Sequence, residues 1–479
     1  MSANLSCVAI ASMIFLVSFA NLVSAAGQLQ LLDAVKNQDR KAVRALLGQG
    51  ADVNARAGDG ATPLHWAVLK EDVETVELLI RAGANVNAAN DHGVTALAVA
   101  CENRSAPLVK RLLDASANPN ASTSMGETAL MTCTRAGSAE AVRALLDRGA
   151  NVNATERSQG QTALMWAVAY RHPEIVRVLI ERGADVHARS DVSNLYVPTN
   201  SYYQYGRQGF VEMPMGGFTP LLFAAQQGDV DSARLLLTAG AKVNETAADG
   251  NSVLVVGAHS GHTTLVAFLL DKGADVNAAG AGYTALHAAV LRGDLEMITS
   301  LLKHGANPNA RITKGTRVPR DTNHWILSTY LTGGTPFLLA AKFAEPEIMR
   351  MLAAHGADPR LATKEATTPL MMAAGLTWGD NMEDRRDRAV PDEVVKALHA
   401  DEARTLEAVK LVLELGADVN AANNAGDTAL HAAAYKGFGS VVQLLVDKGG
   451  DMNAKNKRGK TPQLCYERGK VARCMGVAQ

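Results

Sequence analysis

The feature that most constrains this chain is a phrase that recurs about every 33 residues along most of its 479-residue length. Each occurrence opens on a threonine, or once a serine, and closes on a glycine-led hairpin phrase; the first pair is Thr62–His65 and Gly83–Asn87. Seven of the ten gaps between openings lie within one residue of 33, which predicts a stack of similar supersecondary units. The openings are Thr62, Thr95, Thr128, Thr162, Thr219, Ser252, Thr284, Thr335, Thr368, Thr428 and Thr461.

Each unit has the signals of two short helices. Thr62 suits the N-cap of a first helix, and Pro63 suits the first helical position, where a missing N–H costs nothing. Gly83 suits the left-handed position that ends a second helix. Because one helix pair cannot bury its own apolar face, the sequence predicts an all-α repeat solenoid of about twelve stacked layers over 28–479.

The repeat resembles the ankyrin family in the phrases Thr62–His65, Thr284–His287 and Thr428–His431. The resemblance covers nearly all of 28–479 outside three inserts. It implies layers of helix, helix and β-hairpin or loop, and binding of other macromolecules by the concave side. The chain also resembles exported bacterial ankyrin-repeat proteins, a group with no shared biochemistry, so the likeness by itself assigns no specific function. Ser252 and Gly257 depart from the family pattern, and the last unit is truncated as a terminal cap should be.

Residues 1–25 differ from the rest of the chain. An apolar run from Cys7 to Val23 ends in small residues, which predicts a secretory signal peptide cleaved between Ala25 and Ala26. No lysine or arginine precedes the run, and two alternatives stay open: a buried helix packed on the first repeat, and an uncleaved membrane anchor, for which the run is short and contains Asn21. The leading prediction is a secreted or periplasmic protein without stable membrane insertion after cleavage.

Four cysteines remain after such a cleavage. Cys101 and Cys133 lie in the first helices of adjacent layers, where we expect them to act as small buried apolar residues. Cys465 and Cys474 lie in the two halves of the last unit, at core-facing positions. An oxidising compartment would favour a disulfide between this second pair, although sequence alone does not give the geometry that a disulfide needs.

Three long gaps predict inserts at about 191–216, 311–333 and 376–405. The first insert contains four of the nine tyrosines of the chain, and the second is basic and aromatic with one acid, Asp321. Both extend hairpins, so we expect two fingers on one edge, which either bind a partner or fold back and anchor the loops. The residues in question are Tyr196, Tyr202, Tyr203, Tyr205 and Phe210 in the first insert, and Arg317, Arg320, Trp325 and Tyr330 in the second.

The third insert follows the first helix of its unit and has alternating charge, which is typical of a solvated surface. Pro391–Ala400 is expected to form a short extra helix in the loop between the two helices of that unit. On the concave face between the fingers, repeat register places variable residues that a partner could contact. Those chosen as candidates are Tyr170, Phe218, Tyr283 and Arg292.

No motif for metal binding, phosphate binding or nucleophilic catalysis is present in the sequence, and no cofactor is expected. A net charge of −1 gives no electrostatic case for nucleic acid. The sequence therefore predicts a non-catalytic, monomeric, exported scaffold that binds a protein through the concave face and two inserted loops. The alternatives are a binder of a polysaccharide or envelope polymer through the tyrosine-rich insert and, third, an enzyme built from an insert.

Overall fold

The computed structural model describes residues 30–198, 210–314, 316–320, 323–327, 329–376 and 391–462. Within these residues the predicted all-α repeat solenoid is confirmed, because short helices come in pairs at the repeat period. Contacts group the chain into two compact units. The first unit is Met1–Asp191 with Asp231–Ala241, and the second is Val192–Val230 with Lys242–Gln479.

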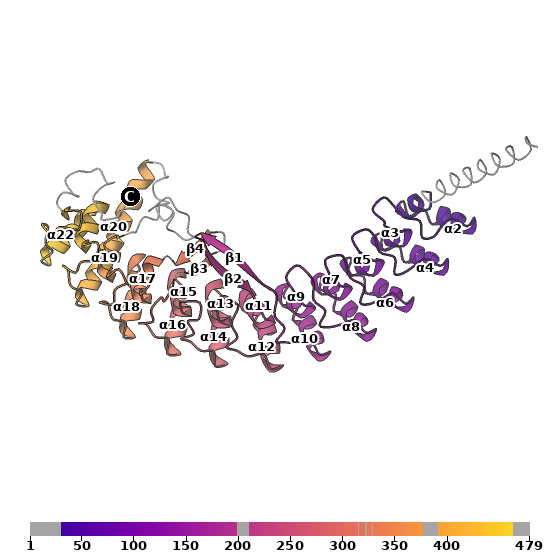
Figure 1. The fold of residues 1–479 in the computed structure, drawn as a ribbon, viewed down its shortest axis with the longest axis horizontal. Helices are drawn as coiled ribbons and strands as arrows, with labels where there is room; N and C mark the ends of the chain where they lie inside the picture. The colour runs from indigo at the N-terminus through magenta and orange to yellow at the C-terminus, as the bar shows by residue number, and fades with distance from the viewer. Residues whose placement is uncertain are drawn as a thin grey trace, which may run out of the picture. The chain divides into compact units, whose positions relative to one another are not determined.

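In the first unit, the first helices of successive layers form one row and the second helices another (Figure 1). Leucines such as Leu97, Leu112 and Leu130 are almost fully buried between the helices, as a stack without a central core requires. The helices are α2 (Arg40–Gly48), α3 (Pro63–Leu69), α4 (Val73–Arg81), α5 (Ala96–Glu102), α6 (Ala106–Asp114), α7 (Ala129–Ala136), α8 (Ala139–Asp147), α9 (Ala163–Ala169) and α10 (Pro173–Glu181).

The chain from residue 192 onward repeats the same layer and adds two β-ribbons. Its helices are α11 (Pro220–Gln227), α12 (Val230–Thr238), α13 (Val253–Ser260), α14 (Thr263–Asp271), α15 (Ala285–Arg292), α16 (Leu295–Lys303), α17 (Pro336–Lys342), α18 (Pro346–Ala354), α19 (Pro369–Ala373), α20 (Pro391–Glu414), α21 (Ala429–Lys436) and α22 (Gly439–Asp447).

The helix boundaries follow the predicted signals. The side chains of Thr95 and Thr162 accept a hydrogen bond from the backbone N–H three residues on, and Gly83 has a φ of +89° after α4. The repeat histidine ties adjacent layers: the Thr62 N–H donates to Nδ1 of His65, and Nε2 then donates to the Val94 carbonyl at 2.9 Å. The predicted capping positions are therefore confirmed, and the histidine adds a link between adjacent layers.

A row of asparagines also links most layers to the next. Asn120 is typical: its Oδ1 accepts from the Asn151 N–H at 2.6 Å, and its Nδ2 donates to the Gly149 carbonyl at 2.9 Å. Each such amide satisfies one donor and one acceptor of the following layer, at about 1 kcal/mol per hydrogen bond. The same pair of bonds recurs at Asn54, Asn87, Asn153, Asn244, Asn277, Asn309 and Asn420.

Arg360 occupies the place where the row would have its next asparagine after Asn309. Its Nε donates to Oδ1 of Asp358 in the same hairpin, at 2.9 Å. We predict that Arg360→Asn would let the amide reach the Asp418 N–H and the Gly416 carbonyl, and would raise the local free energy of unfolding by about 1–2 kcal/mol. Slower hydrogen exchange in α20 checks this, and Asn309→Arg should have the opposite effect on α18. Unchanged exchange in both variants would contradict the coupling.

The first two inserts form antiparallel ribbons, as their predicted extension of hairpins implies. Strand β1 (Val192–Pro198) pairs with β2 (Phe210–Gly216), so that Val192 lies opposite Gly216 and Pro198 opposite Phe210. Strand β3 (Thr316–Arg320) pairs with β4 (Asn323–Leu327), and the short helix η2 (Thr329–Leu331) returns the chain to α17.

The third insert differs from its prediction. Residues 377–390 lie outside the described part of the chain, and the segment expected as a separate short helix is the first part of α20, a single helix of 24 residues that ends at Glu414. The apolar spacing was compatible with a helix, but no proline or glycine separates Ala400 from the second helix of the unit. The insert therefore lengthens that second helix at its N-terminal end as well as the connection before it.

Candidate functional site

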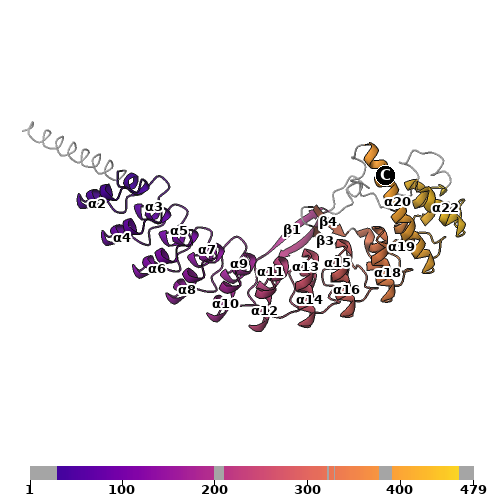
Figure 2. The ribbon, with the colours of Figure 1, turned by 180° about the vertical axis from the view of Figure 1, so that it is seen from behind.

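Both ribbons lie on the side of the first helices, away from the row of second helices (Figure 2). Strand β3 contacts α13, so the second ribbon reaches back to the first helix of the preceding layer. We define the ribbon face as strands β1, β2, β3 and β4 with the first helices α11, α13 and α15. The expectation that an insert folds back onto the array is met by the second ribbon, and the expectation that the inserts bind a partner stays a prediction.

The strand register shows which insert residues share a face of each ribbon. In the first ribbon Tyr196 and Phe210 fall on the same face, because Tyr196 pairs with Glu212 and Phe210 with Pro198, two positions along. In the second ribbon Trp325 pairs with Val318, whereas Arg317 pairs with Ile326. Arg320 and Trp325 thus share one face and Arg317 occupies the other, a separation that sequence spacing did not reveal.

The foot of the first ribbon is an aromatic patch. The rings of Phe218 and Phe223 lie 5.4 Å apart at a tilt of 57°, and both side chains are half-exposed. Val192, at the start of β1, is 55% exposed, and a Cβ at Gly217 would contact both Val192 and Ala248. The predicted candidate Phe218 is therefore accompanied by Phe223 and Val192, which sequence reasoning did not select.

Tyr283 does not belong to this surface, and its prediction as a contact residue is wrong. Its side chain is only 1% exposed, and its hydroxyl donates to Oδ1 of Asn251 at 3.0 Å. Burial, followed by the charge of Asp249, raises the pKa of the Tyr283 hydroxyl above its usual range. The ring fills the space between two hairpins. The prediction had placed it at an exposed hairpin tip.

Two other candidates are partly engaged within the array. Nη1 of Arg292 donates to the His259 carbonyl at 3.0 Å, and its guanidinium lies so close to Gly261 that a Cβ there would clash. Arg292 thus caps the end of the preceding first helix, α13, while its side chain stays half-exposed. Tyr330 is half-buried in η2, beside the turn where Arg311 donates to the Gly333 carbonyl at 3.0 Å.

Tyr170 lies in the first unit, apart from the other described candidates, directly after α9. Its side chain is 51% exposed. Leu69, the last residue of α3, is 49% exposed and was not selected from the sequence. A search for large apolar residues at the end of each first helix would have found both of them.

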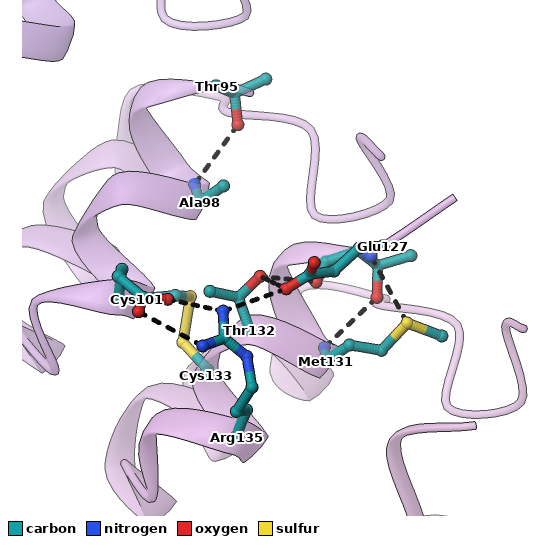
Figure 3. Close-up of a disulfide and its surroundings, with 10 residues drawn as sticks. Thr95, Ala98, Cys101, Glu127, Met131, Thr132, Cys133 and Arg135 are labelled. Atoms are coloured by element: carbon teal, nitrogen blue, oxygen red, sulfur yellow. Dashed lines mark hydrogen bonds and ion pairs between the residues drawn. A yellow bond between two sulfur atoms is a disulfide. The ribbon is translucent and has the colours of Figure 1, made fainter. Parts of the chain in front are cut away.

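Cys101 and Cys133 form a disulfide, so the expectation that they are free apolar residues is wrong (Figure 3). Their Cα atoms are 4.4 Å apart on α5 and α7, and both side chains are fully buried. Arg135, two residues beyond Cys133, donates to Glu102 at 2.7 Å and to Glu127 at 3.3 Å. A covalent link and a charged cluster thus join the same two layers.

Several predictions lie outside the described residues. They are the signal peptide, the remaining tyrosines of the first insert (Tyr202, Tyr203, Tyr205) and the pair Cys465 and Cys474. Among the residues that the structure does describe, no group of three histidine, cysteine or acidic side chains gathers as a metal site would. None of the described helices combines the length and apolar character needed to cross a membrane.

The comparisons with known proteins agree with the helix-helix-hairpin layers. The family described as "Ankyrin repeats (3 copies)" matches residues 31–123, 103–190 and 221–312, and "Ankyrin repeats (many copies)" matches 396–462. These matches cover more than half of the chain. The chain belongs to the ankyrin repeat family.

Similar curated proteins share the repeats over only part of their length. "Ankyrin repeat and SOCS box protein 16" of Homo sapiens is 34% identical over 230 residues, which are 44% of this chain and 46% of that protein. A "Putative ankyrin repeat-containing protein" of Treponema pallidum is 41% identical over 93 residues, 19% of this chain and 31% of that protein. "BCL-6 corepressor-like protein 1" of Homo sapiens is 33% identical over 156 residues, 31% of this chain and 8% of that protein. The chain thus spans less than half the length of each.

The family defines a class of function. Ankyrin repeat arrays are protein-interaction scaffolds and are generally non-catalytic, and this coarse function applies to the present chain. The repeats supply a regular surface of first helices, and two of the inserts add β-ribbons beside it.

Proposed function

We propose that this chain is an exported scaffold that binds a protein partner through the ribbon face. The observation that carries the proposal is the presence of two inserted β-ribbons and a half-exposed aromatic patch on the side of the first helices. Aromatic residues and arginine are enriched at binding hot spots, and inserted loops on a rigid scaffold concentrate function. Phe218 and Phe223 supply the aromatic surface, and the second ribbon contributes Arg317, Arg320 and Trp325 by sequence.

Export is supported by two independent features. The apolar run that ends near Ala25 has the length and small-residue ending of a secretory signal. The disulfide between Cys101 and Cys133 is a bond that forms and persists in oxidising compartments. Sequencing of the mature N-terminus should find Ala26 as the first residue, and a chain that keeps Met1 and free thiols in the cytosol would contradict export.

Site-specific photo-crosslinking tests the binding surface in cells that produce the full chain. A photoreactive phenylalanine in place of Phe218 should give a protease-sensitive adduct with one protein. The matched control replaces Val446, which is 36% exposed at the end of α22, and should give none. Equal adducts at both positions, or none at Phe218, would remove the ribbon face from the proposal.

The polysaccharide alternative is favoured by one observation, the placement of Tyr196 and Phe210 on the same face of the first ribbon. Aromatic side chains that share a face can stack on sugar rings as well as on protein. The same crosslinking experiment separates the two functions. An adduct at position 218 that survives protease and is cleaved by periodate would identify a glycan partner in place of a protein.

A further inference from the structure

The first ribbon is a two-stranded sheet, and each of its strands has one outer backbone edge. Among the described strands, β1 and β2 pair only with each other. In an antiparallel pair, successive residues direct their N–H and carbonyl groups alternately toward the other strand and away from it. An isolated two-stranded ribbon is only marginally stable in water, and an unpaired edge is a template for another strand.

The prolines of the ribbon fix which residues point outward. Pro214 lies opposite Asn194. Because a proline has no N–H for a cross-strand hydrogen bond, this pair must be of the kind that directs its backbone groups away from the other strand. Pro198, four residues after Asn194, falls in the same alternation. Along β1, Val192, Asn194 and Tyr196 therefore direct both their N–H and carbonyl groups to the outer edge.

The edge of β2 is protected, whereas the edge of β1 is not. Pro214 removes an outward donor within β2, and the carbonyl of Gly216 accepts from the Ala248 N–H at 3.1 Å. Prolines and charged side chains are the devices that commonly keep a strand edge from pairing. Strand β1 has no charged residue, and its one proline is its last residue. It therefore presents a run of outward donors and acceptors without such a device.

The second ribbon offers less on both of its edges. Pro319 lies opposite His324, so the same argument places its missing N–H at the outer edge of β3, which also carries two arginines. Strand β4 has five residues and directs the backbone groups of only His324 and Ile326 outward. Among the four described strands, β1 thus has the longest unprotected edge.

The two faces of the first ribbon indicate which side chains an added strand needs. Glu212 and Pro214 are exposed on one face, whereas Met215 on the other face is half-buried. Five of the six residues that the register assigns to this second face are apolar: Leu195, Val197, Val211, Met213 and Met215. A strand beside β1 extends both faces, so we expect it to be apolar at every second position, opposite Leu195 and Val197.

Strand β1 begins at the aromatic patch. A Cβ at Gly217 would lie 3.4 Å from Cγ2 of Val192, and Gly217 directly precedes Phe218. A segment paired with β1 can therefore continue onto the surface formed by Phe218 and Phe223. The edge and the patch form one continuous binding surface.

We propose that the protein partner of the ribbon face supplies an extended segment that pairs with the outer edge of β1 as a third strand. An α-helix uses its own backbone groups internally and cannot pair with the outward groups of β1, whereas an extended segment can. The segment alternates apolar and polar residues, and its polar residues lie opposite Val192, Asn194 and Tyr196. The proposal rests on the proposed scaffold function and specifies the form of the partner.

Two backbone-methylated peptides test the proposal. Both are fluorescein-labelled, alternate valine and threonine between terminal lysines, and have the same composition. One is N-methylated on its threonines, whose N–H groups face β1 in the proposed pairing, and the other on its valines, whose N–H groups face away. Fluorescence anisotropy with the full chain should show saturable binding of the valine-methylated peptide. The threonine-methylated peptide loses its cross-strand donors and should bind at least about tenfold more weakly.

Proline substitutions in the chain supply a matched pair of variants. Asn194→Pro removes an outward donor of β1, and Glu212→Pro removes an outward donor of β2, while both leave the hydrogen bonds between the two strands in place. Asn194→Pro should weaken binding of the valine-methylated peptide at least about tenfold, whereas Glu212→Pro should bind as the unchanged chain does. Protection of 192–198 from hydrogen exchange in both variants checks that the ribbon is retained.

Equal binding of the two peptides, absence of saturable binding, or equal loss in the two variants would overturn the proposal. A dimer of the full chain in sedimentation that Asn194→Pro dissociates would also overturn it, because the edge would then belong to a second copy of the chain. Crosslinking at Phe218 is a separate measurement. A protein adduct there, without a preference between the peptides, would leave the scaffold function standing and remove the added strand.

Discussion

Acidification from pH of about 6.5 to about 4 should lower the free energy of unfolding of the second unit by about 3 kcal/mol through one side chain, His287. The imidazole is fully buried, and burial lowers its pKa to about 4. In the unfolded chain the same group has a pKa of about 6.5. Between these values the unfolded state binds a proton that the folded state does not, so stability falls as the pH falls and changes no further below about 4.

The repeat itself supplies the matched variant. Met131 and Met165 occupy the place of His287 in other layers, three residues after their opening threonines. His287→Met should therefore fold, and its stability should depend less on pH over this window. Denaturant unfolding at several pH values, followed by hydrogen exchange in α15, measures the slope. An equally steep decline in both chains would assign the acid sensitivity to other groups, such as His65 and His431, whose pKa values burial also lowers.

The sequence was enough to predict the architecture, because the same helix-start and helix-end residues recur in each layer. Thr62 and Pro63 set the start of α3, Gly83 follows the end of α4, and such boundaries recur where the pattern placed them. The interlayer role of the asparagine row was not predicted, although its members recur at the repeat period. A polar residue in a turn satisfies local turn propensity, and its bonds to the next layer depend on how closely two hairpins stack.

One layer shows how a local irregularity is absorbed. The hairpin before Thr162 has one residue more than its neighbours, and Glu156 stands where Asn90 stands in an ordinary hairpin. Asn90 accepts from the backbone N–H groups two and four residues on, whereas the longer Glu156 accepts from those two, three and five residues on. The glutamate side chain is one methylene longer than that of asparagine, and this added length lets its carboxylate reach across the one-residue-longer hairpin. Burial raises the pKa of Glu156, but the hydrogen bond from the Ser158 hydroxyl and those from the backbone N–H groups lower it by more, so the pKa lies below its usual value.

The candidate site was less predictable than the fold because exposure depends on neighbouring layers. Repeat register placed Tyr283 and Phe218 in comparable positions before their threonines, yet Tyr283 is buried and Phe218 is half-exposed. In its buried position the hydroxyl of Tyr283 donates a hydrogen bond to Oδ1 of Asn251. Strand register likewise decided which of Arg317 and Arg320 shares a face with Trp325, and sequence spacing in a loop of unknown turn could not supply it.

The disulfide pair shows the same limit. Cys101 lies six residues after Thr95, and Cys133 lies five residues after Thr128, so the two occupy nearly equivalent places in adjacent layers. That near-equivalence, with a separation of 32 residues, was the available signal. Sequence does not report how closely two first helices approach. Because free cysteines are commonly buried as small apolar residues, that interpretation was preferred to a disulfide.

Loss of this disulfide should destabilise layers α5 to α8 by about 3–4 kcal/mol, since closing a loop of 32 residues removes that much entropy from the unfolded chain. The neighbouring layers again provide the replacement residues. Val68 and Val168 occupy the place of Cys101, and Ala100 and Ala167 that of Cys133, so Cys101→Val with Cys133→Ala removes the bond while keeping the packing of an ordinary layer.

Hydrogen exchange of α5 to α8 should be faster in the double variant than in the unchanged chain. The unchanged chain should reach the same rate once a reductant has cleaved the bond during local unfolding of these layers. Both sulfurs are buried, so reduction should be slow unless a mild denaturant is present. Alkylation of the unfolded, unreduced chain should leave Cys101 and Cys133 unmodified. Modification of both thiols without reductant, or unchanged exchange in the double variant, would show that the layers hold together by packing alone, and export would then rest on the N-terminal signal by itself.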